Sequence, residues 1–94
     1  MVITFDPVKR TKNLHDRQLD FLDAEIVLSG PVFTIEDTRF DYGEQRFQTV
    51  RFLASRMVMV MVVWTPRDDA VHVMSMRKCN DKEQARYSKR LEEG

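Results

Sequence analysis

Eight consecutive apolar side chains, from Met57 to Trp64, constrain the fold of this chain more than any other stretch. The run is too short for a membrane-spanning helix, which needs about 20 apolar residues. It is rich in valine, and β-branched side chains favour strands over solvent-facing helices. An uninterrupted apolar run of this length is typical of a strand that is buried on both faces. The sequence therefore predicts a strand in the middle of a sheet.

A polar segment and a second strand follow this run. The segment from Thr65 to Asp69 contains a proline and two aspartates, so we expect the chain to reverse direction there. From Val71 to Lys78 the side chains should then alternate between the two faces of a strand. One face would carry Val71, Val73, Ser75 and Arg77, and the other would carry His72, Met74, Met76 and Lys78. The end of this strand would present cations on both faces.

The flanking segments predict three helices and further strands. Asp6 and Asp20 are placed to cap two N-terminal helices, and Asn80 with Glu83 forms a capping box at the start of a third. The first helix is expected to direct Lys9, Arg10, Lys12 and Asn13 to solvent. The remaining strands are expected at residues 32–35 and 47–53. Segregated helices and strands indicate an α+β fold: one domain over residues 1–94, with an antiparallel four- to five-stranded sheet, two N-terminal helices and one C-terminal helix.

Composition describes an ordinary small globular domain. The chain of 94 residues has 15 basic and 15 acidic side chains, and its formal net charge is zero. The charge is unevenly distributed, because residues 16–44 hold eight acids and two bases, whereas residues 45–94 hold ten bases and six acids. We find no transmembrane segment and no export signal. The single cysteine, Cys79, cannot form an internal disulfide, which fits the cytoplasm.

The sequence lacks the motifs of several kinds of catalytic site. The two histidines and one cysteine are far apart and do not have the spacing of metal ligands. The three glycines form neither a phosphate-binding loop nor a nucleophilic serine turn. We therefore expect no metal and no cofactor.

A group of cations on the predicted sheet is the main candidate for chemistry. These cations are Arg46, Arg67, Arg77 and Lys78, and His72 and Glu44 are their titratable neighbours. Guanidinium groups on rigid strands suit a phosphodiester, because they present fixed donors to its oxygens and stabilise the charge that develops in the transition state. Such a site needs no metal when the nucleophile is the 2′-hydroxyl of RNA.

The same residues also have a purely structural interpretation. The ion pairs that would account for them are Arg46 with Glu44 or Asp41, Arg67 with Asp68 or Asp69, and Arg77 with Glu83. His72 alternates with two methionines and would then be a packed, hydrogen-bonded side chain. From spacing alone, both interpretations stay open.

The chain resembles a known family at positions that span most of its length. The matching residues are Phe5-Asp6-Pro7, Lys9, Asn13-Leu14, Leu19-Asp20-Phe21, Ala24, Asp41-Tyr42-Gly43-Glu44-Gln45-Arg46, Ser75-Met76-Arg77-Lys78-Cys79, Glu83 and Tyr87. Together they are similar to BrnT, the toxin of BrnT/BrnA type II toxin–antitoxin systems. The resemblance implies a RelE-like ribonuclease fold, metal-independent RNA cleavage and growth arrest. It also implies a BrnA-type antitoxin with a ribbon-helix-helix domain, and operator DNA bound only through the toxin–antitoxin complex.

Two positions depart from the family pattern. His72 stands where the family usually has arginine, and Asp16-Arg17-Gln18 replaces the usual Lys-His-Gly. The family's basic positions are otherwise matched by Arg46, Arg67, Arg77 and Lys78, whereas Glu44, Glu83 and Tyr87 match but fit structural roles as well.

Two functions follow as expectations. The first is a cytoplasmic toxin that cleaves RNA, in which Arg77 and Arg67 stabilise the phosphoryl charge and Lys78 and Arg46 hold the backbone. His72 or Glu44 would accept the proton. The second is a protein-binding module without catalysis, whose Met-rich strands and basic helix engage an acidic or apolar partner.

Overall fold

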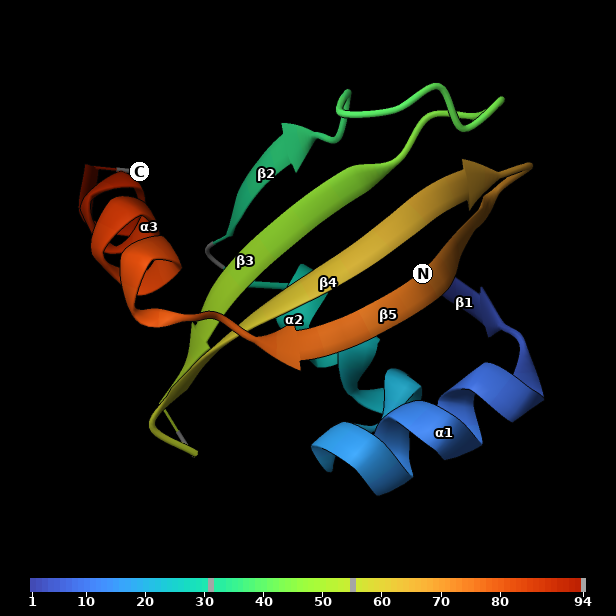
Figure 1. The fold of residues 1–94 in the computed structure, drawn as a ribbon, viewed down its shortest axis with the longest axis horizontal. Coiled ribbons are helices and arrows are strands. Elements are labelled where there is room, and N and C mark those ends of the chain that lie inside the picture. Colours follow the sequence, from blue (N-terminus) through green and yellow to red (C-terminus); the bar gives the residue numbers. More distant parts are fainter. Residues whose placement is uncertain (31, 55, 94) are drawn as a thin grey trace.

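A five-stranded sheet forms the centre of the molecule (Figure 1). The computed structural model describes residues 1–30, 32–54 and 56–93, with the backbone alone for 92 and 93. The strands are β1 (Val2–Phe5), β2 (Phe33–Glu36), β3 (Phe47–Leu53), β4 (Val58–Arg67) and β5 (Ala70–Lys78). The helices are α1 (Pro7–Arg17), α2 (Ala24–Leu28), which follows a short 3₁₀ turn (Phe21–Asp23), and α3 (Asp81–Glu93). The strand order is β1-β5-β4-β3-β2, so the prediction of a central apolar strand is confirmed.

The hairpin between β4 and β5 is tighter than the sequence suggested. Thr65, Pro66 and Arg67, which were expected in the turn, continue β4 and lie opposite His72, Val71 and Ala70. The turn is Asp68-Asp69 alone, with Asp68 in the left-handed region at φ 52°. Proline is tolerated in this strand because pairing with β3 ends at Trp64, so Pro66 lies beyond the two-sided part of the ladder.

The sheet is mixed, which corrects the expectation of a purely antiparallel sheet. β1 pairs in parallel with β5, from Val2 opposite Ala70 to Phe5 opposite Val73. The other pairs are antiparallel. The parallel pair arises because α1 follows β1 and the chain returns to the sheet through a long connection, as parallel neighbours require.

An irregularity in β5 changes which residues share a face. Val63 lies opposite Ser75, but the next residue of β4, Trp64, lies opposite Val73, so Met74 is an extra residue. The simple alternation predicted for this strand is therefore wrong across Met74. Val73 and Met76 face the same buried cluster, and His72, Ser75 and Arg77 share the opposite face.

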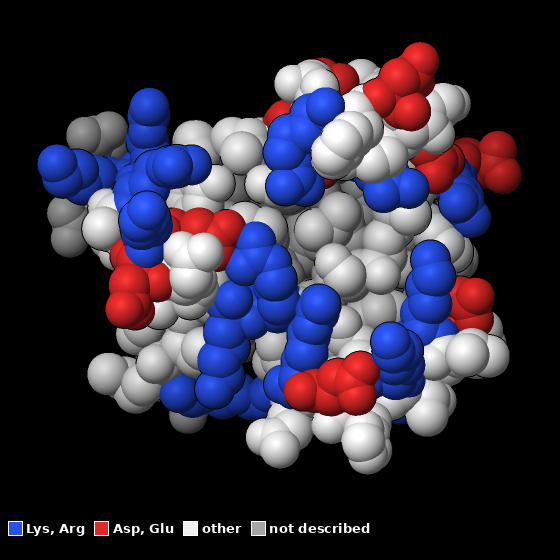
Figure 2. Space-filling view, viewed as in Figure 1, with Lys and Arg blue, Asp and Glu red and all other residues white. Residues whose placement is uncertain are grey.

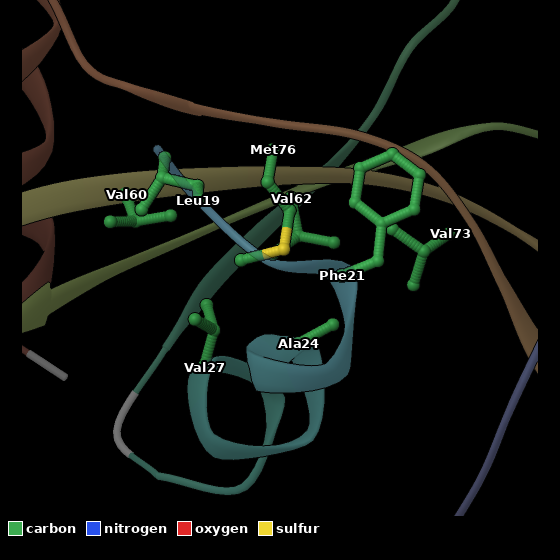
Figure 3. Close-up of a cluster of buried hydrophobic side chains, with 8 residues drawn as sticks. All are labelled: Leu19, Phe21, Ala24, Val27, Val60, Val62, Val73 and Met76. Atoms are coloured by element: carbon green, nitrogen blue, oxygen red, sulfur yellow. The ribbon is translucent and has the colours of Figure 1, made fainter. Parts of the chain in front are cut away.

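Each face of the sheet has its own hydrophobic cluster. Figure 3 shows the first cluster, between the strands and the helical segment that contains α2. Its members are Leu19, Phe21, Ala24, Val27, Val60, Val62, Val73 and Met76. The second cluster packs the strands against α3 and consists of Val50, Met59, Met61, Cys79 and Tyr87. In the described chain, α3 covers one end of that face and no helix crosses its middle (Figure 1). We call this uncovered part the open face.

The predicted helix caps are confirmed, but one orientation is wrong. Asp6 accepts from the Val8 amide and Asp20 from the Leu22 amide. The Asn80 side chain accepts from the Glu83 backbone amide and the Glu83 carboxylate accepts from the Asn80 backbone amide, both at 2.9 Å. Asn13, however, is buried instead of pointing to solvent, because its amide group satisfies backbone atoms of two other segments.

Candidate functional site

The structure separates the six candidate residues into three places. His72, Arg67, Glu44 and Arg46 belong to the end of the sheet next to the β4–β5 turn. Arg77 lies on the same face but at the other end of β5, beside α3. Lys78 projects from the opposite face, because it follows Arg77 directly in the strand. The six side chains therefore do not converge on one phosphate.

His72 is a titratable side chain on the open face. It is half-buried on β5, and its Nδ1 lies 2.9 Å from Oγ1 of Thr4 on β1. Burial lowers the pKa of His72 below its ordinary value, and the charges of Arg67 and Lys9 lower it further. Glu44 acts in the other direction. The imidazole is therefore neutral at neutral pH and fixed in orientation by Thr4, as a proton acceptor must be.

Arg67 is the cation nearest to His72 along the hairpin. Thr65 lies directly opposite His72, and Arg67 follows two residues later on the same face of β4. Diagonal neighbours of this kind have side chains about 7–8 Å apart. Arg67 pairs with Glu44 at 3.4 Å, not with Asp68 or Asp69, and both side chains remain substantially exposed. A single long contact leaves most of the guanidinium donors available.

Arg46 is held by an aromatic ring instead of by Glu44 or Asp41. Its guanidinium carbon lies 3.9 Å from the centroid of the Tyr42 ring. Its buried Nε has no hydrogen-bond partner in the described structure. A buried donor without an acceptor is costly. The Tyr42 ring therefore holds Arg46 in a position where this atom is covered and unsatisfied.

The loop that carries Arg46 is organised by the buried carboxylate of Asp37. Arg39 donates to it from both its backbone amide and its guanidinium, and Tyr42 donates its hydroxyl at 3.2 Å. These bonds lower the pKa of Asp37, with the Arg39 side chain as the main cause. Asp37 therefore fixes the ring on which Arg46 lies.

Arg77 forms the ion pair that the structural interpretation predicted. Both of its terminal nitrogens donate to the Glu83 carboxylate at 2.7 Å. These bonds lower the pKa of Glu83 to about 2. The β4 partners of Arg77 and His72 are Met61 and Thr65, so the two residues are about 13 Å apart along the sheet. Arg77 lines a hollow of about 250 Å³ together with Arg39, Arg86 and other residues.

Sequence reasoning missed three residues of this region. Thr4 positions His72, and Asp37 with Tyr42 positions Arg46. The signal for Tyr42 was its place beside Arg46 in an Asp- and Gly-rich loop, but nothing in the sequence showed that β1 would lie beside β5. The contact between Thr4 and His72 depends entirely on that parallel pairing.

Two features are absent from the part of the chain that the structure describes: a cluster of metal-ligating side chains and a membrane-spanning helix. No group of three or more potential metal-ligating side chains is present among the described residues. No helix in the part of the chain that the structure describes has the length and apolar character needed to cross a bilayer.

A family model described as "Ribonuclease toxin, BrnT, of type II toxin-antitoxin system" matches residues 5–83. The chain belongs to the BrnT family. The crystal structure of the Brucella abortus ribonuclease toxin BrnT is similar, with a TM-score of 0.62 and 30% sequence identity. That match covers 86% of this chain and 99% of the Brucella chain. The comparison with curated proteins gave no match.

These findings confirm the BrnT resemblance and the α+β fold class that the sequence predicted. Membership in this family also places the chain among the toxins of type II toxin–antitoxin systems, in which a toxin has an antitoxin partner. The roles of individual residues in this BrnT-family chain stay predictions.

Proposed function

We propose that this chain is a metal-independent endoribonuclease that arrests growth by cleaving RNA. The observation that carries the proposal is the placement of His72, Arg67 and Arg46 at one end of a sheet face that no described helix crosses. Figure 2 supports it, because Lys and Arg side chains surround a largely uncharged central area on the side of the molecule shown there.

The proposed reaction is an internal transfer at a phosphodiester. In the proposed tautomer the proton of neutral His72 is on Nδ1, which lies 2.9 Å from Oγ1 of Thr4, so Nε2 accepts the proton of an RNA 2′-hydroxyl. The 2′-oxygen bonds to the adjacent phosphorus, and the bond from phosphorus to the 5′-oxygen breaks. Solvent protonates the leaving 5′-oxygen. The products are a 2′,3′-cyclic phosphate and a 5′-hydroxyl, and no metal or cofactor is consumed. Glu44 is the second candidate for the proton acceptor.

The cations act on the charge of the phosphate. Arg67 has donors that Glu44 does not occupy, and the guanidinium of Arg46 is held in place on the Tyr42 ring. Fixed donors of this kind stabilise the extra negative charge of the pentavalent transition state. Arg77 is already bound to Glu83 and lies too far along the strand to reach the same phosphate. We therefore assign it to the RNA backbone beside α3, which changes the role expected from the sequence.

The partner proposals follow from the family. We propose a cytoplasmic toxin that is neutralised by a BrnA-type antitoxin with a ribbon-helix-helix domain. Operator DNA would be bound only by the complex. These partners are supported by membership in a toxin family of type II systems.

Incubation of the purified, antitoxin-free protein with single-stranded RNA in the presence of EDTA tests the activity. We expect fragments that end in cyclic phosphate, and we expect Arg67→Ala and His72→Gln to slow their formation about 10²-fold or more. Lys82→Gln, at an exposed position of α3, is the matched control and should cleave normally. Intact RNA at low salt, from a folded protein that still binds an antitoxin, would favour a non-catalytic protein-binding module instead.

A further inference from the structure

A second basic surface lies outside the proposed catalytic group, where α1 meets the far part of β5. We call it the basic border and define it by five side chains: Lys9, Lys12, Arg17, Arg56 and Lys78. Figure 2 shows Lys and Arg side chains in a row along this side of the molecule, where Figure 1 places α1 beside β5.

The basic border exists because β1 is shorter than its partner. β1 pairs only with Ala70 to Val73, so the following residues of β5 have a free edge toward α1. Asn13 accepts from the Met76 amide at 3.4 Å, and Arg17 donates to the Met76 carbonyl at 3.5 Å. These bonds attach α1 to the edge where a longer β1 would otherwise pair. Side chains of α1 therefore line a groove along β5.

Two adjoining hollows form this groove. The first has a volume of about 170 Å³ and is lined by Lys9, Lys12, Arg17 and Ser75, among others. The second has a volume of about 190 Å³ and is lined by Arg17, Arg56 and Lys78, among others. Arg17 lines both, so the two hollows adjoin at this side chain.

The charge of the basic border is only partly neutralised. Asp16 and Asp23 are its acidic neighbours. Their contacts are long, 3.8 Å from Lys12 to Asp16 and 3.6 Å from Arg56 to Asp23. Lys9, Arg17 and Lys78 have no ion pair with any carboxylate whose side chain the structure describes. Exposed pairs at such distances hold the cations weakly, so the groups are free to contact a polyanion.

We propose that the basic border binds the phosphate backbone of the same RNA strand whose cleavage is proposed above. The inference rests on the proposed function and extends the substrate path beyond the scissile phosphate. Ser75 connects the two regions. It lines the first hollow, and its place in β5 also puts it on the open face, between His72 and Arg77. A strand that leaves the catalytic group along β5 reaches the basic border at this residue.

The composition of the groove favours RNA over a protein partner. Of its apolar lining residues, Leu19 and Phe21 are buried and Val58 and Met74 are half-buried, and all its other lining residues are polar or charged. The core of a protein–protein interface needs accessible apolar or aromatic anchors and few charges. The three lysines and two arginines of the basic border are instead suited to sequence-independent phosphate contacts.

A matched pair of double variants tests the proposal. Lys12→Gln/Arg17→Gln removes two charges from the basic border, and Lys82→Gln/Lys89→Gln removes two charges from exposed positions of α3. The probe is a single-stranded 2′-O-methyl RNA that contains every dinucleotide step, which binds but has no free 2′-hydroxyl. The variant of the basic border should raise the Kd about tenfold. It should also reduce the slope of log Kd against log salt by about 1.4, since each single-strand phosphate contact contributes about 0.7.

Cleavage separates this inference from the proposed function. The border variant should raise the KM for the full-length unmodified RNA and leave the kcat for dinucleotides unchanged. Failure of the wild-type protein to cleave any RNA would overturn the proposed function, while the binding measurement would still test the border. An unchanged Kd in the border variant, or an equal loss in the α3 variant, would overturn the inference. The inference would also be overturned if the border variant bound RNA normally but was no longer neutralised by the antitoxin. Lys12→Gln alone, at an exposed position, keeps the test valid if the double variant unfolds.

Discussion

At the scale of single residues, Arg67 and Arg77 differ in how much of their guanidinium is occupied. Arg77 has two carboxylate oxygens at 2.7 Å, whereas Arg67 has one at 3.4 Å. Their substitutions should therefore have opposite profiles. Arg67→Ala should lower the kcat on dinucleotides about 10²–10³-fold, as expected for a donor to the transition state, with little change in stability. Arg77→Ala should lower stability by about 1–3 kcal/mol, because Glu83 loses its partner, with a smaller effect on dinucleotide cleavage.

The assignment of roles is checked by measuring urea unfolding and single-turnover cleavage on both variants. A larger kcat loss for Arg77→Ala than for Arg67→Ala, in folded proteins, would return Arg77 to the catalytic position expected from the sequence.

The neutral state of His72 predicts how kcat/KM should depend on pH. A general base must be unprotonated, and burial lowers the pKa of His72 from its ordinary value of 6.5. The kcat/KM should therefore be constant near neutral pH and fall only when the pH drops through a value below 6.5. His72→Gln can still hydrogen-bond Thr4 but cannot take the proton, so this acidic limb should disappear from its residual activity. An unchanged limb would assign the titration to another group, with Glu44 the first candidate.

The lowered pKa of Glu83 makes the stability of the folded protein depend on pH in the acidic range. The folded-state pKa is about 2, against an ordinary value of 4.5, with the Arg77 hydrogen bonds as the main cause. A lowered folded-state pKa stabilises the protein above pH 4.5, and this contribution is lost as the pH falls toward 2. Glu83→Gln should be less stable than wild type by about 2 kcal/mol at neutral pH. The difference should shrink across that window in urea unfolding, whereas a constant difference would contradict the ion-pair explanation.

At the scale of elements, the buried amide of Asn13 and the guanidinium of Arg17 attach α1 to β5. Asn13 donates to the Leu19 carbonyl at 2.9 Å and accepts from the Met76 amide. Asn13→Ala leaves both backbone groups without a partner and should cost about 1–3 kcal/mol. Leu14→Ala changes the adjacent residue of the same helix, which is 42% exposed, and should cost less than about 0.5 kcal/mol. Equal costs in chemical unfolding would show that the helix is held by other contacts.

The same element shows what the sequence could and could not predict. Caps and apolar runs depend on neighbouring residues, so the helix starts, β3 and the central position of β4 were predictable. The parallel pairing of β1 with β5 and the burial of Asn13 depend on contacts between residues far apart in the chain. The prediction of the candidate site was limited in the same way. The sequence identified its residues, but their division into three places depends on the register of β5.

At the scale of the whole molecule, the two hydrophobic clusters share one strand. Val60 and Val62 contribute to the cluster beneath α2, while Met59 and Met61 contribute to the cluster beneath α3. Loss of either cluster exposes one side of β4, so we expect a single cooperative unfolding transition. Trp64 fluorescence reports on the first side, and far-ultraviolet circular dichroism reports on all helices. Coincident transitions in guanidinium would support this coupling. An earlier transition by dichroism would show that α3 unfolds separately.

The extra residue at Met74 has a consequence for comparing this protein with its relatives. Side chains on the N-terminal side of Met74 are in the opposite phase from those on its C-terminal side. A sequence alignment with a one-position gap on the wrong side of this methionine would therefore shift the alternation of the strand. It would assign the imidazole of His72 to the core and the side chain of Val73 to the surface. Family members that lack the insertion would need arginine or histidine at a neighbouring position to keep a basic group on the same side.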